Sequence, residues 1–415
     1  CLSLLCLFLE RLHLGSQMIK MFQQTIRLLF LPVFLFAGIE KELQTQFILA
    51  APGDTIRIPD GNHQIRGTLS IEGKKDLVII GAGMDKTILS FKNQDEGAQG
   101  ISITNSSNIT LEDFSVKDTR GDAIKVQYTD GIIFRRITAE WSGDPEETNG
   151  AYGLYPVQCQ NVLVEYSVAI GASDAGIYVG QSSDIIVRYS KAYNNVAGIE
   201  IENSFNAMVY ENHSYNNTGG ILVFDLPDLV QKKGGNVHID NNLIENNNLR
   251  NFAPPGNIVG KVIPGTGIMI LACNDVHVFN NIIRNNKSVG AGIVSYFMTE
   301  EPINDSLYNP YTSDIHIYNN EFERWPGFPD LGYEIGQLLA VKYGRNTPDI
   351  VYDGMRDPES LIGLCIQNNQ DARFTNLDIE HNFDEWYSPF ISNFSEDISR
   401  HNCKKDHSLN HSIKK

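Results

Sequence analysis

Side chains suited to acid–base chemistry recur at regular intervals in the middle of the sequence. Lysine or tyrosine can abstract a proton next to a carboxylate, and a second tyrosine can protonate a leaving oxygen. These steps cleave or epimerise a uronate-containing polysaccharide. The predicted catalytic residues are Lys125, Tyr152, Tyr155 and Tyr178, and the predicted substrate-binding residues are Gln127, Gln158, Gln181, Glu200, Glu202 and Asp225.

The candidate residues belong to a repeat of about 22 residues. A small residue followed by an aliphatic one opens a strand-like run in each repeat. Two further short apolar runs follow, separated by turns rich in Asn, which tolerates left-handed corners and can stack in ladders. Three short strands per coil predict an all-β parallel β-helix. The opening pairs are Gly100-Ile101, Ala123-Ile124, Gly153-Leu154, Gly176-Ile177, Gly198-Ile199, Gly220-Ile221, Gly267-Ile268 and Gly292-Ile293.

Alternation along these strands predicts which side chains share a face. The aliphatic residue of each opening pair points into the core, so its neighbours point outward. We expect one solvent-exposed column to contain Ser102, Lys125, Tyr155, Tyr178, Glu200, Leu222, Met269 and Val294. The next column contains Thr104, Gln127, Val157, Gly180, Glu202, Phe224, Leu271 and Tyr296.

The repeat divides the chain into four parts. Residues 1–38 are expected to be an upstream segment and a signal peptide, and residues 39–97 a cap with the first coils. Residues 98–325 form the β-helix repeats. Residues 326–415 are a C-terminal cap and an irregular tail, in which the stretch DLGYEIGQLLAVKYG predicts a short helix.

The N-terminal segment resembles a secretory signal. Met18 and Met21 are followed by Arg27 and an apolar run over residues 28–38 that ends in small residues. This run is shorter than the roughly 20 residues that a membrane-spanning helix needs. We therefore expect a secreted, periplasmic or cell-envelope protein whose mature chain has no membrane span.

Charge and cysteine usage limit the ligands. The net charge of −17 argues against nucleic acid as a partner. Cys365 and Cys403 are candidates for a disulfide. His238, His277 and His316 recur at one register, but we expect them in widely separated coils. No metal site and no cofactor is evident, although calcium is a cation that the acidic residues could hold.

The coil pattern resembles the pectin-lyase-like superfamily of right-handed parallel β-helices. The phrases YGLYPVQC, SDAGIYVGQS, AGIEIENS and GGILVFDLP are similar to a family of exported bacterial β-helix repeat proteins with no established activity. A more distant similarity to mannuronan epimerases covers Tyr152, Gly153 and Pro156. Tyr155 and Val157 stand where those enzymes have Asp and His, and Gly180 where they have a later carboxylate, so the epimerase mechanism does not carry over.

Two functions follow as expectations. The first is an exported protein that binds an extended polysaccharide, and a uronate-containing polymer is the expected type. If the protein is an enzyme, we expect it to cleave or epimerise this polymer. The alternative is a non-catalytic envelope scaffold or adhesion module. It would dock a protein partner through an apolar stripe formed by Leu222, Phe224, Met269, Leu271 and Tyr296.

Overall fold

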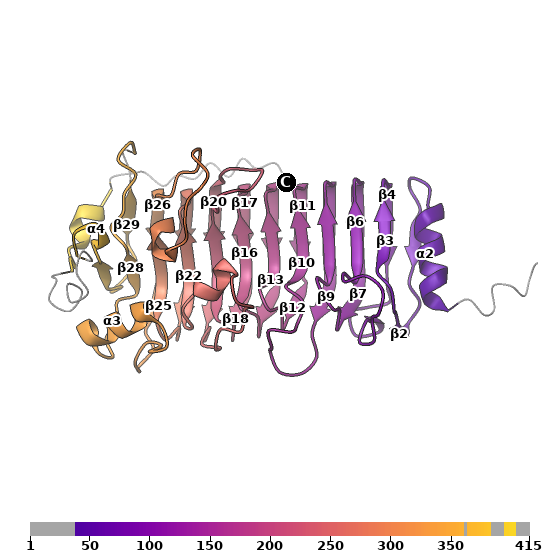
Figure 1. Ribbon diagram of the computed structural model, residues 1–415, viewed down its shortest axis with the longest axis horizontal. Coiled ribbons are helices and arrows are strands. Elements are labelled where there is room, and N and C mark those ends of the chain that lie inside the picture. Colours follow the sequence, from indigo (N-terminus) through magenta and orange to yellow (C-terminus); the bar gives the residue numbers. More distant parts are fainter. Residues whose placement is uncertain (1–37, 361–362, 383–393, 404–415) are drawn as a thin grey trace, which may run out of the picture.

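The computed structural model describes residues 38–360, 363–382 and 394–403. The expected upstream segment and signal peptide therefore lie almost entirely outside the described residues. The described chain is a right-handed parallel β-helix, as predicted, and its coils stack along one axis (Figure 1). None of the helices in the described ranges has the length and hydropathy that crossing a bilayer requires.

In the described part of the chain, two sheets contain all of the named strands, and every pairing between these strands is parallel. Sheet B has one strand from each coil: β3 (Leu69–Glu72), β6 (Ile101–Thr104), β8 (Ile124–Gln127), β10 (Tyr152–Val157), β13 (Ala175–Gly180), β16 (Ala197–Glu202), β19 (Gly219–Phe224), β22 (Thr266–Leu271), β25 (Val289–Val294), β28 (Ile350–Tyr352) and β30 (Phe374–Asn376).

Sheet A contains the other strands of the coils. They are β1 (Thr55–Arg57), β2 (Gly61–Gln64), β4 (Lys75–Ile80), β5 (Thr87–Ser90), β7 (Ser107–Lys117), β9 (Asp130–Glu140), β11 (Gln160–Glu165), β12 (Val168–Ile170), β14 (Ser183–Arg188), β15 (Lys191–Tyr193), β17 (Phe205–Tyr210), β18 (His213–Tyr215), β20 (Gly235–Asp240), β21 (Leu243–Glu245), β23 (Asn274–Phe279), β24 (Ile282–Arg284), β26 (Ser313–Tyr318), β27 (Glu321–Glu323) and β29 (Leu364–Gln367).

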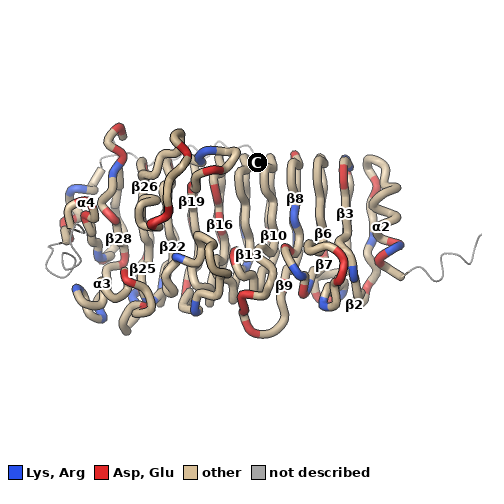
Figure 2. The backbone as a smooth tube through the Cα atoms, viewed as in Figure 1, with Lys and Arg blue, Asp and Glu red and all other residues tan. Residues whose placement is uncertain are grey.

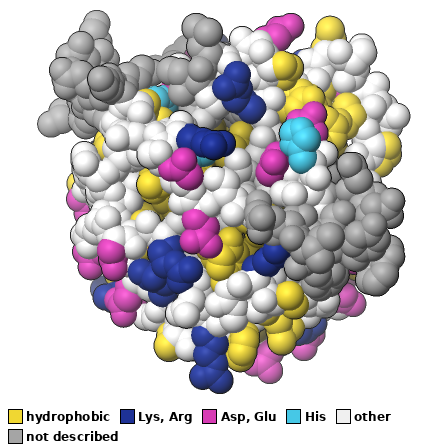
Figure 3. Space-filling model, turned by 90° about the vertical axis from the view of Figure 1, so that its left-hand side faces the viewer, with side chains coloured by type: hydrophobic (Ala, Val, Ile, Leu, Met, Phe, Trp, Pro, Cys, Tyr) yellow, Lys and Arg dark blue, Asp and Glu magenta, His cyan; other side chains and the backbone are white. Residues whose placement is uncertain are grey.

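Helices occupy the two ends of the stack. Helix α2 (Ile39–Leu49) covers the first coil and buries Leu43 and Phe47 against it. The predicted C-terminal helix is α3 (Glu334–Tyr343), and α4 (Ile379–Asn382) follows. Charged side chains are interspersed with smaller hydrophobic areas on this end (Figure 3). Both sheets continue past the boundary expected at residue 325, since β28, β29 and β30 add further rungs.

The core is formed by the aliphatic residues predicted to point inward. Ile101, Ile124, Leu154, Ile177 and Ile199 are fully buried, and strand pairing places them in one column. One register prediction is wrong: Met269 pairs with Gly292, so Val294 lies beside Leu271. Tyr296 belongs to the short helix η3 (Tyr296–Thr299) and to no column of sheet B.

Asparagine ladders hold the corners together, as predicted. Asn195 donates from Nδ2 to Oδ1 of Asn217 at 3.0 Å, Asn217 donates to Asn247 at 3.0 Å, and Asn247 donates to Asn286 at 3.1 Å. All four side chains are buried. Neighbouring corner residues such as Asn216 have positive φ, which Asn tolerates.

Breaking this ladder is expected to destabilise the solenoid. Asn217→Ala removes the Oδ1 that accepts from the buried backbone N–H and Nδ2 of Asn195, and the Nδ2 that donates to Asn247, which costs about 3 kcal/mol of unfolding free energy. Urea denaturation measures this loss. Asn216→Gly is the control, because this exposed neighbour keeps its left-handed backbone and should stay within about 0.5 kcal/mol of the parent. Equal losses in both variants would contradict the role of the ladder.

Candidate functional site

The outer face of sheet B has an open half and a covered half. The open half comprises β3, β6, β8 and β10, whose outward side chains include the partly exposed Ser102 and Lys125. The covered half comprises β13, β16, β19 and β22. The prediction that one continuous face is exposed to solvent is therefore wrong, because Tyr178 is only 4% exposed and Glu200 only 3%.

Two segments cover this half of the sheet, and we call them together the cover: residues 246–265, which include η2 (Ile258–Lys261), and residues 296–311, which include η3. Long excursions from regular coils form both. Phe252, Val259 and Val262 of the first segment and Tyr296 and Tyr308 of the second join one buried apolar cluster. Their partners on sheet B include Ala175, Tyr178, Leu222, Phe224 and Leu271.

The apolar stripe predicted to dock a protein partner lies under this cover. Leu222 and Phe224 are fully buried, Leu271 and Tyr296 are nearly so, and Met269 is partly exposed. The predicted exposure of the stripe is therefore wrong, because the chain itself supplies the apolar partner.

The structure brings the four predicted catalytic residues together where the open and covered halves meet. The ring centroids of Tyr152, Tyr155 and Tyr178 are 4.4–5.0 Å apart. The Lys125 Nζ lies 5.0 Å from the centroid of the Tyr155 ring. Lys125, Tyr152 and Tyr155 belong to strands of the open half, and Tyr178 belongs to the covered half.

A cluster of four buried acidic side chains lies next to the tyrosines. This acidic cluster comprises Asp174, Glu200, Glu202 and Asp225. Figure 2 shows the acidic residues of β16, while the neighbouring β13 and β19 carry no charged residue. Asp174 is not among the predicted site residues, because it lies in a turn before β13 and becomes part of the cluster only through the tertiary structure.

Hydrogen bonds connect the tyrosines and the cover to the acidic cluster. The Tyr178 hydroxyl donates to Glu202 Oε1 at 2.5 Å, and the Tyr152 hydroxyl donates to Asp174 Oδ2 at 3.3 Å. Asn257 of the cover donates to the same Asp174 oxygen at 3.1 Å. None of the described residues supplies a hydrogen-bond partner for the buried Glu200 Oε2.

Tyr178 reaches Glu202 because residue 180 is glycine. A Cβ atom at Gly180 would overlap the ring and the hydroxyl of Tyr178. The absent side chain therefore lets the ring lie flat over β13 and point toward β16. The position that carries a carboxylate in mannuronan epimerases thus has a packing role here.

Burial makes the acidic cluster hold protons more strongly than ordinary carboxyl groups. It raises the pKa of Asp174 and Asp225 from 3.8 to about 7, and the nearby charge of Glu202 adds to both shifts. Burial also raises the pKa of Glu202 from 4.5 to about 7. The pKa of Glu200 rises well above 4.5 for the same reason, helped by the charges of Asp174 and Glu202.

The tyrosines are proton donors in this arrangement. Burial, and then nearby carboxylates, raise the pKa of Tyr152, Tyr155 and Tyr178 well above 10. The phenols therefore stay protonated at neutral pH. The prediction that a tyrosine abstracts a proton does not suit this geometry, in which the two carboxyl groups hydrogen-bonded to tyrosines, Asp174 and Glu202, have pKa values near neutrality.

A polar pocket of about 360 Å³ opens beside the open half of sheet B, and we call it the glutamine pocket. Its lining includes Gln158 and Gln181 together with Tyr128, which is 55% exposed. Gln127 donates to Gln158 Oε1 at 2.8 Å and orients that amide. The three glutamines predicted to bind substrate are thus adjacent and accessible, whereas the predicted acidic ligands are buried.

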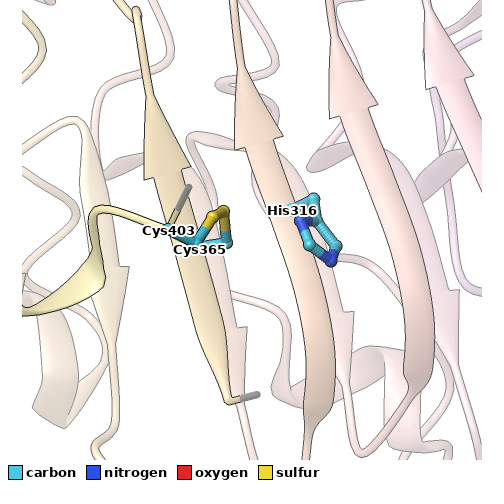
Figure 4. Close-up of side chains that lie close together, drawn as sticks. All are labelled: His316, Cys365 and Cys403. Carbon is cyan, nitrogen blue, oxygen red and sulfur yellow. A yellow bond between two sulfur atoms is a disulfide. The ribbon is translucent and has the colours of Figure 1, made fainter. Parts of the chain in front are cut away.

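The predicted disulfide between Cys365 and Cys403 is present, whereas the arrangement of the histidines differs from the prediction. Cys365 and Cys403 form a disulfide, with Cα atoms 5.6 Å apart, and His316 lies beside it (Figure 4). The expectation of widely separated histidines is wrong, because His238, His277 and His316 occupy consecutive rungs with ring centroids 5.0 and 4.5 Å apart. Insertions lengthen the sequence between them without adding coils.

Among the residues that the structure describes, the acidic cluster does not bring three carboxylate oxygens within 4.8 Å of one another, as a calcium ion would need. His316, Cys365 and Cys403 do place one ligand atom each within that distance. Calcium binding at the acidic residues stays a prediction.

Comparisons with known proteins agree with the fold. The family model described as "right handed beta helix region" matches residues 78–231. No curated protein sequence is significantly similar to the chain. The A-module of mannuronan C-5 epimerase AlgE4 from Azotobacter vinelandii is similar in structure, with a TM-score of 0.51 and 16% identity over 80% of this chain and 92% of that chain.

Two further solved structures have comparable similarity. The A-module of AlgE6 from the same bacterium has a TM-score of 0.50 and 16% identity over 81% of this chain and 91% of that chain. The N-terminal fragment of gene product 12 of bacteriophage Phi29 has a TM-score of 0.51 and 13% identity over 80% of this chain and 60% of that chain. Identities this low show a shared fold.

Proposed function

Because the chain is a right-handed parallel β-helix with pectin-lyase-like architecture, we propose that it binds an extended, uronate-containing polysaccharide along the open half of sheet B. The observation that carries the proposal is the accessible glutamine pocket next to Lys125 and Tyr155. The strands of this half are consecutive rungs of one sheet and offer a long polar surface to a chain-like ligand.

The accessible residues match the chemistry of such a polymer. An exposed aromatic ring such as that of Tyr128 can stack on the apolar face of a sugar. Glutamine amides both donate and accept hydrogen bonds, as sugar hydroxyls do, and the ammonium group of Lys125 can pair with a uronate carboxylate. Each group thus has a specific partner in a uronate chain.

Polysaccharide binding needs fewer correctly placed groups at this site than catalysis does. Lyases and epimerases of uronates must remove a proton next to the carboxylate, and the acceptors available here are Asp174 and Glu202. Both lie beneath the cover, so a reaction requires the cover to move, whereas binding in the glutamine pocket does not. Polysaccharide binding is therefore the function that the geometry supports best.

The partial epimerase pattern supports mannuronan as the first polymer to test. Tyr152, Gly153 and Pro156 are shared, and Val157 pairs directly with Gly180 on the next strand. Both of these positions lack an ionisable group, but Glu202 follows Gly180 on the next rung. A carboxyl group is thus displaced by one coil from its position in the epimerases.

Loss of the Tyr128 ring is expected to weaken polymer binding by about tenfold, or about 1.4 kcal/mol. Affinity electrophoresis in gels containing mannuronan, polygalacturonate or a neutral glucan, with and without calcium, measures the effect of Tyr128→Ala. Tyr166→Ala is the control, because Tyr166 is 49% exposed and has the same left-handed backbone but lies at another corner. Equal retardation of both variants and the parent would contradict the proposal, as would migration of the parent unaffected by every polymer.

Catalysis is tested in the same samples. Absorbance of unsaturated ends detects a lyase, and proton NMR of the recovered polymer detects epimerisation. If a reaction occurs, the triple variant Lys125→Ala, Tyr155→Phe, Glu200→Gln should lose it. A triple variant with parental affinity and activity would exclude this face as the site.

We also propose that the protein works in the periplasm, in the cell envelope or outside the cell. The Cys365–Cys403 disulfide supports an oxidising compartment. Fractionation of cells that express the full chain tests this, and recovery of the protein in the cytoplasmic fraction alone would contradict it.

A further inference from the structure

The column of histidines on sheet A ends at a pair of cysteines. His316 on β26 pairs in register with Cys365 on β29, and the chain returns at residues 394–403 to bring Cys403 alongside. The ligand atoms of these three residues all lie within 4.8 Å of one another. His316 and Cys365 are buried, while Cys403 lies partly exposed at the surface and gives access.

The surroundings of His316 resemble those of metal-binding histidines. Its Nε2 lies 2.7 Å from Asp314 Oδ1, and a carboxylate in this position fixes the tautomer of the ring. With the proton on Nε2, the lone pair is on Nδ1. The His277 ring stacks on the opposite side at 4.5 Å and holds the His316 ring in place.

The position of Cys403 does not depend on the disulfide alone. Asn376 and Ser395 form an antiparallel bridge that anchors the returning segment. His401 Nδ1 lies 3.3 Å from the Leu364 carbonyl, and the Gln367 side chain donates to the Asn402 side chain and to the Cys403 carbonyl. Both thiols are therefore expected to stay near His316 after reduction.

We propose that His316, Cys365 and Cys403 form a binding site for a soft d10 metal ion, Cu(I) or Zn(II), which opens when the disulfide is reduced. Two thiolates and an imidazole are ligands that both ions accept. A fourth position would be left to water in the case of Zn(II).

The site opens by thiol–disulfide exchange. A dithiol reductant transfers two electrons and two protons to the Cys365–Cys403 bond, giving two thiols, and becomes a disulfide itself. Metal binding then releases the two thiol protons as the sulfur–metal bonds form. Exchange with a second disulfide reverses the step: it takes up the two electrons, becomes a dithiol, re-forms the Cys365–Cys403 bond and expels the ion, so the disulfide is the metal-free state.

Competition titrations of the full chain test the site. Protein reduced with dithiothreitol and desalted without oxygen is titrated with Cu(I) against bicinchoninate and with Zn(II) against a chromophoric chelator. We expect one equivalent of at least one ion to bind, and at least tenfold weaker binding in Cys403→Ser and His316→Gln. His238→Gln is the control, because this ring belongs to the same column two rungs away.

A second readout does not depend on a variant that folds. Metal bound to the reduced parent should protect Cys365 and Cys403 from alkylation, as measured on their peptides by mass spectrometry, and should leave the alkylation of the buried Cys159 unchanged. Failure of the reduced chain to bind either ion would overturn the proposal. Equally tight binding by the oxidised protein would also overturn it. Binding that leaves these two cysteines unprotected from alkylation would overturn it as well.

Discussion

Replacing Glu202 with Gln is expected to stabilise the protein at pH 8 and to leave its stability nearly unchanged at pH 4.5. The folded carboxyl keeps its proton up to about pH 7, whereas the unfolded one releases it near pH 4.5. Each proton that only the folded state retains makes stability fall as pH rises between these two values. Glutamine carries no ionisable group, so the variant avoids this loss, which is on the order of 3 kcal/mol.

Thermal unfolding at pH 4.5 and pH 8 measures the effect, and Asp174→Asn should shift in the same direction. Glu72→Gln is the control, since Glu72 is an exposed residue of the same sheet and its replacement should shift unfolding equally at both pH values. A Glu202→Gln variant that is less stable than the parent at pH 8 would contradict the raised pKa. It would indicate that the cluster is charged in the folded protein and neutralised by a bound cation.

Gly220→Ala is expected to destabilise the solenoid by about 3 kcal/mol. A Cβ atom at residue 220 would lie 2.5 Å from the Gly267 carbonyl oxygen and 2.6 Å from Ile244 Cγ2. The backbone has no unusual φ there, so the loss would come from the close approach of consecutive coils. Relief would require the rungs to separate and would weaken their hydrogen bonds.

Chemical denaturation of Gly220→Ala measures this loss. Gly292→Ala is the matched control, because Gly292 is also a strand residue of sheet B and a Cβ there would have no neighbour nearer than 3.7 Å. We expect the control to stay within about 0.5 kcal/mol of the parent. If both variants lost stability equally, intrinsic glycine effects would explain the result and close coil packing would not.

The close approach of consecutive coils at these glycines also explains why the repeat is recognisable in the sequence. In several coils a Cβ atom at the glycine before the inward aliphatic residue would collide with the next coil, as at Gly220, Gly267 and Gly290. It also explains the error at β25, where Gly290-Ala291 and Gly292-Ile293 both fit the repeat. Gly290 takes the close position, since a Cβ there would lie 2.7 Å from the Asp349 carbonyl oxygen.

The sequence by itself determined the coil, its inward residues, its asparagine corners and the neighbourhood of Lys125, Tyr155 and Tyr178. These features depend on contacts between equivalent positions of adjacent coils, which repeat with the period of the sequence. The adjacency of Gln127, Gln158 and Gln181 follows from the same register, whereas the insertion that contains Val230 and Gln231 completes the pocket.

Only the tertiary structure decided which of these residues are exposed to solvent and which contact residues from the long insertions. The cover is formed by irregular segments that share no period with the coils, so the burial of Glu200 and Glu202 and the arrival of Asn257 at Asp174 could not be derived from the repeat. Likewise, His316 meets Cys403 because the chain folds back over its last coils. Such contacts depend on where an aperiodic segment finds apolar surface and hydrogen-bond partners, and that is settled only when the solenoid has formed.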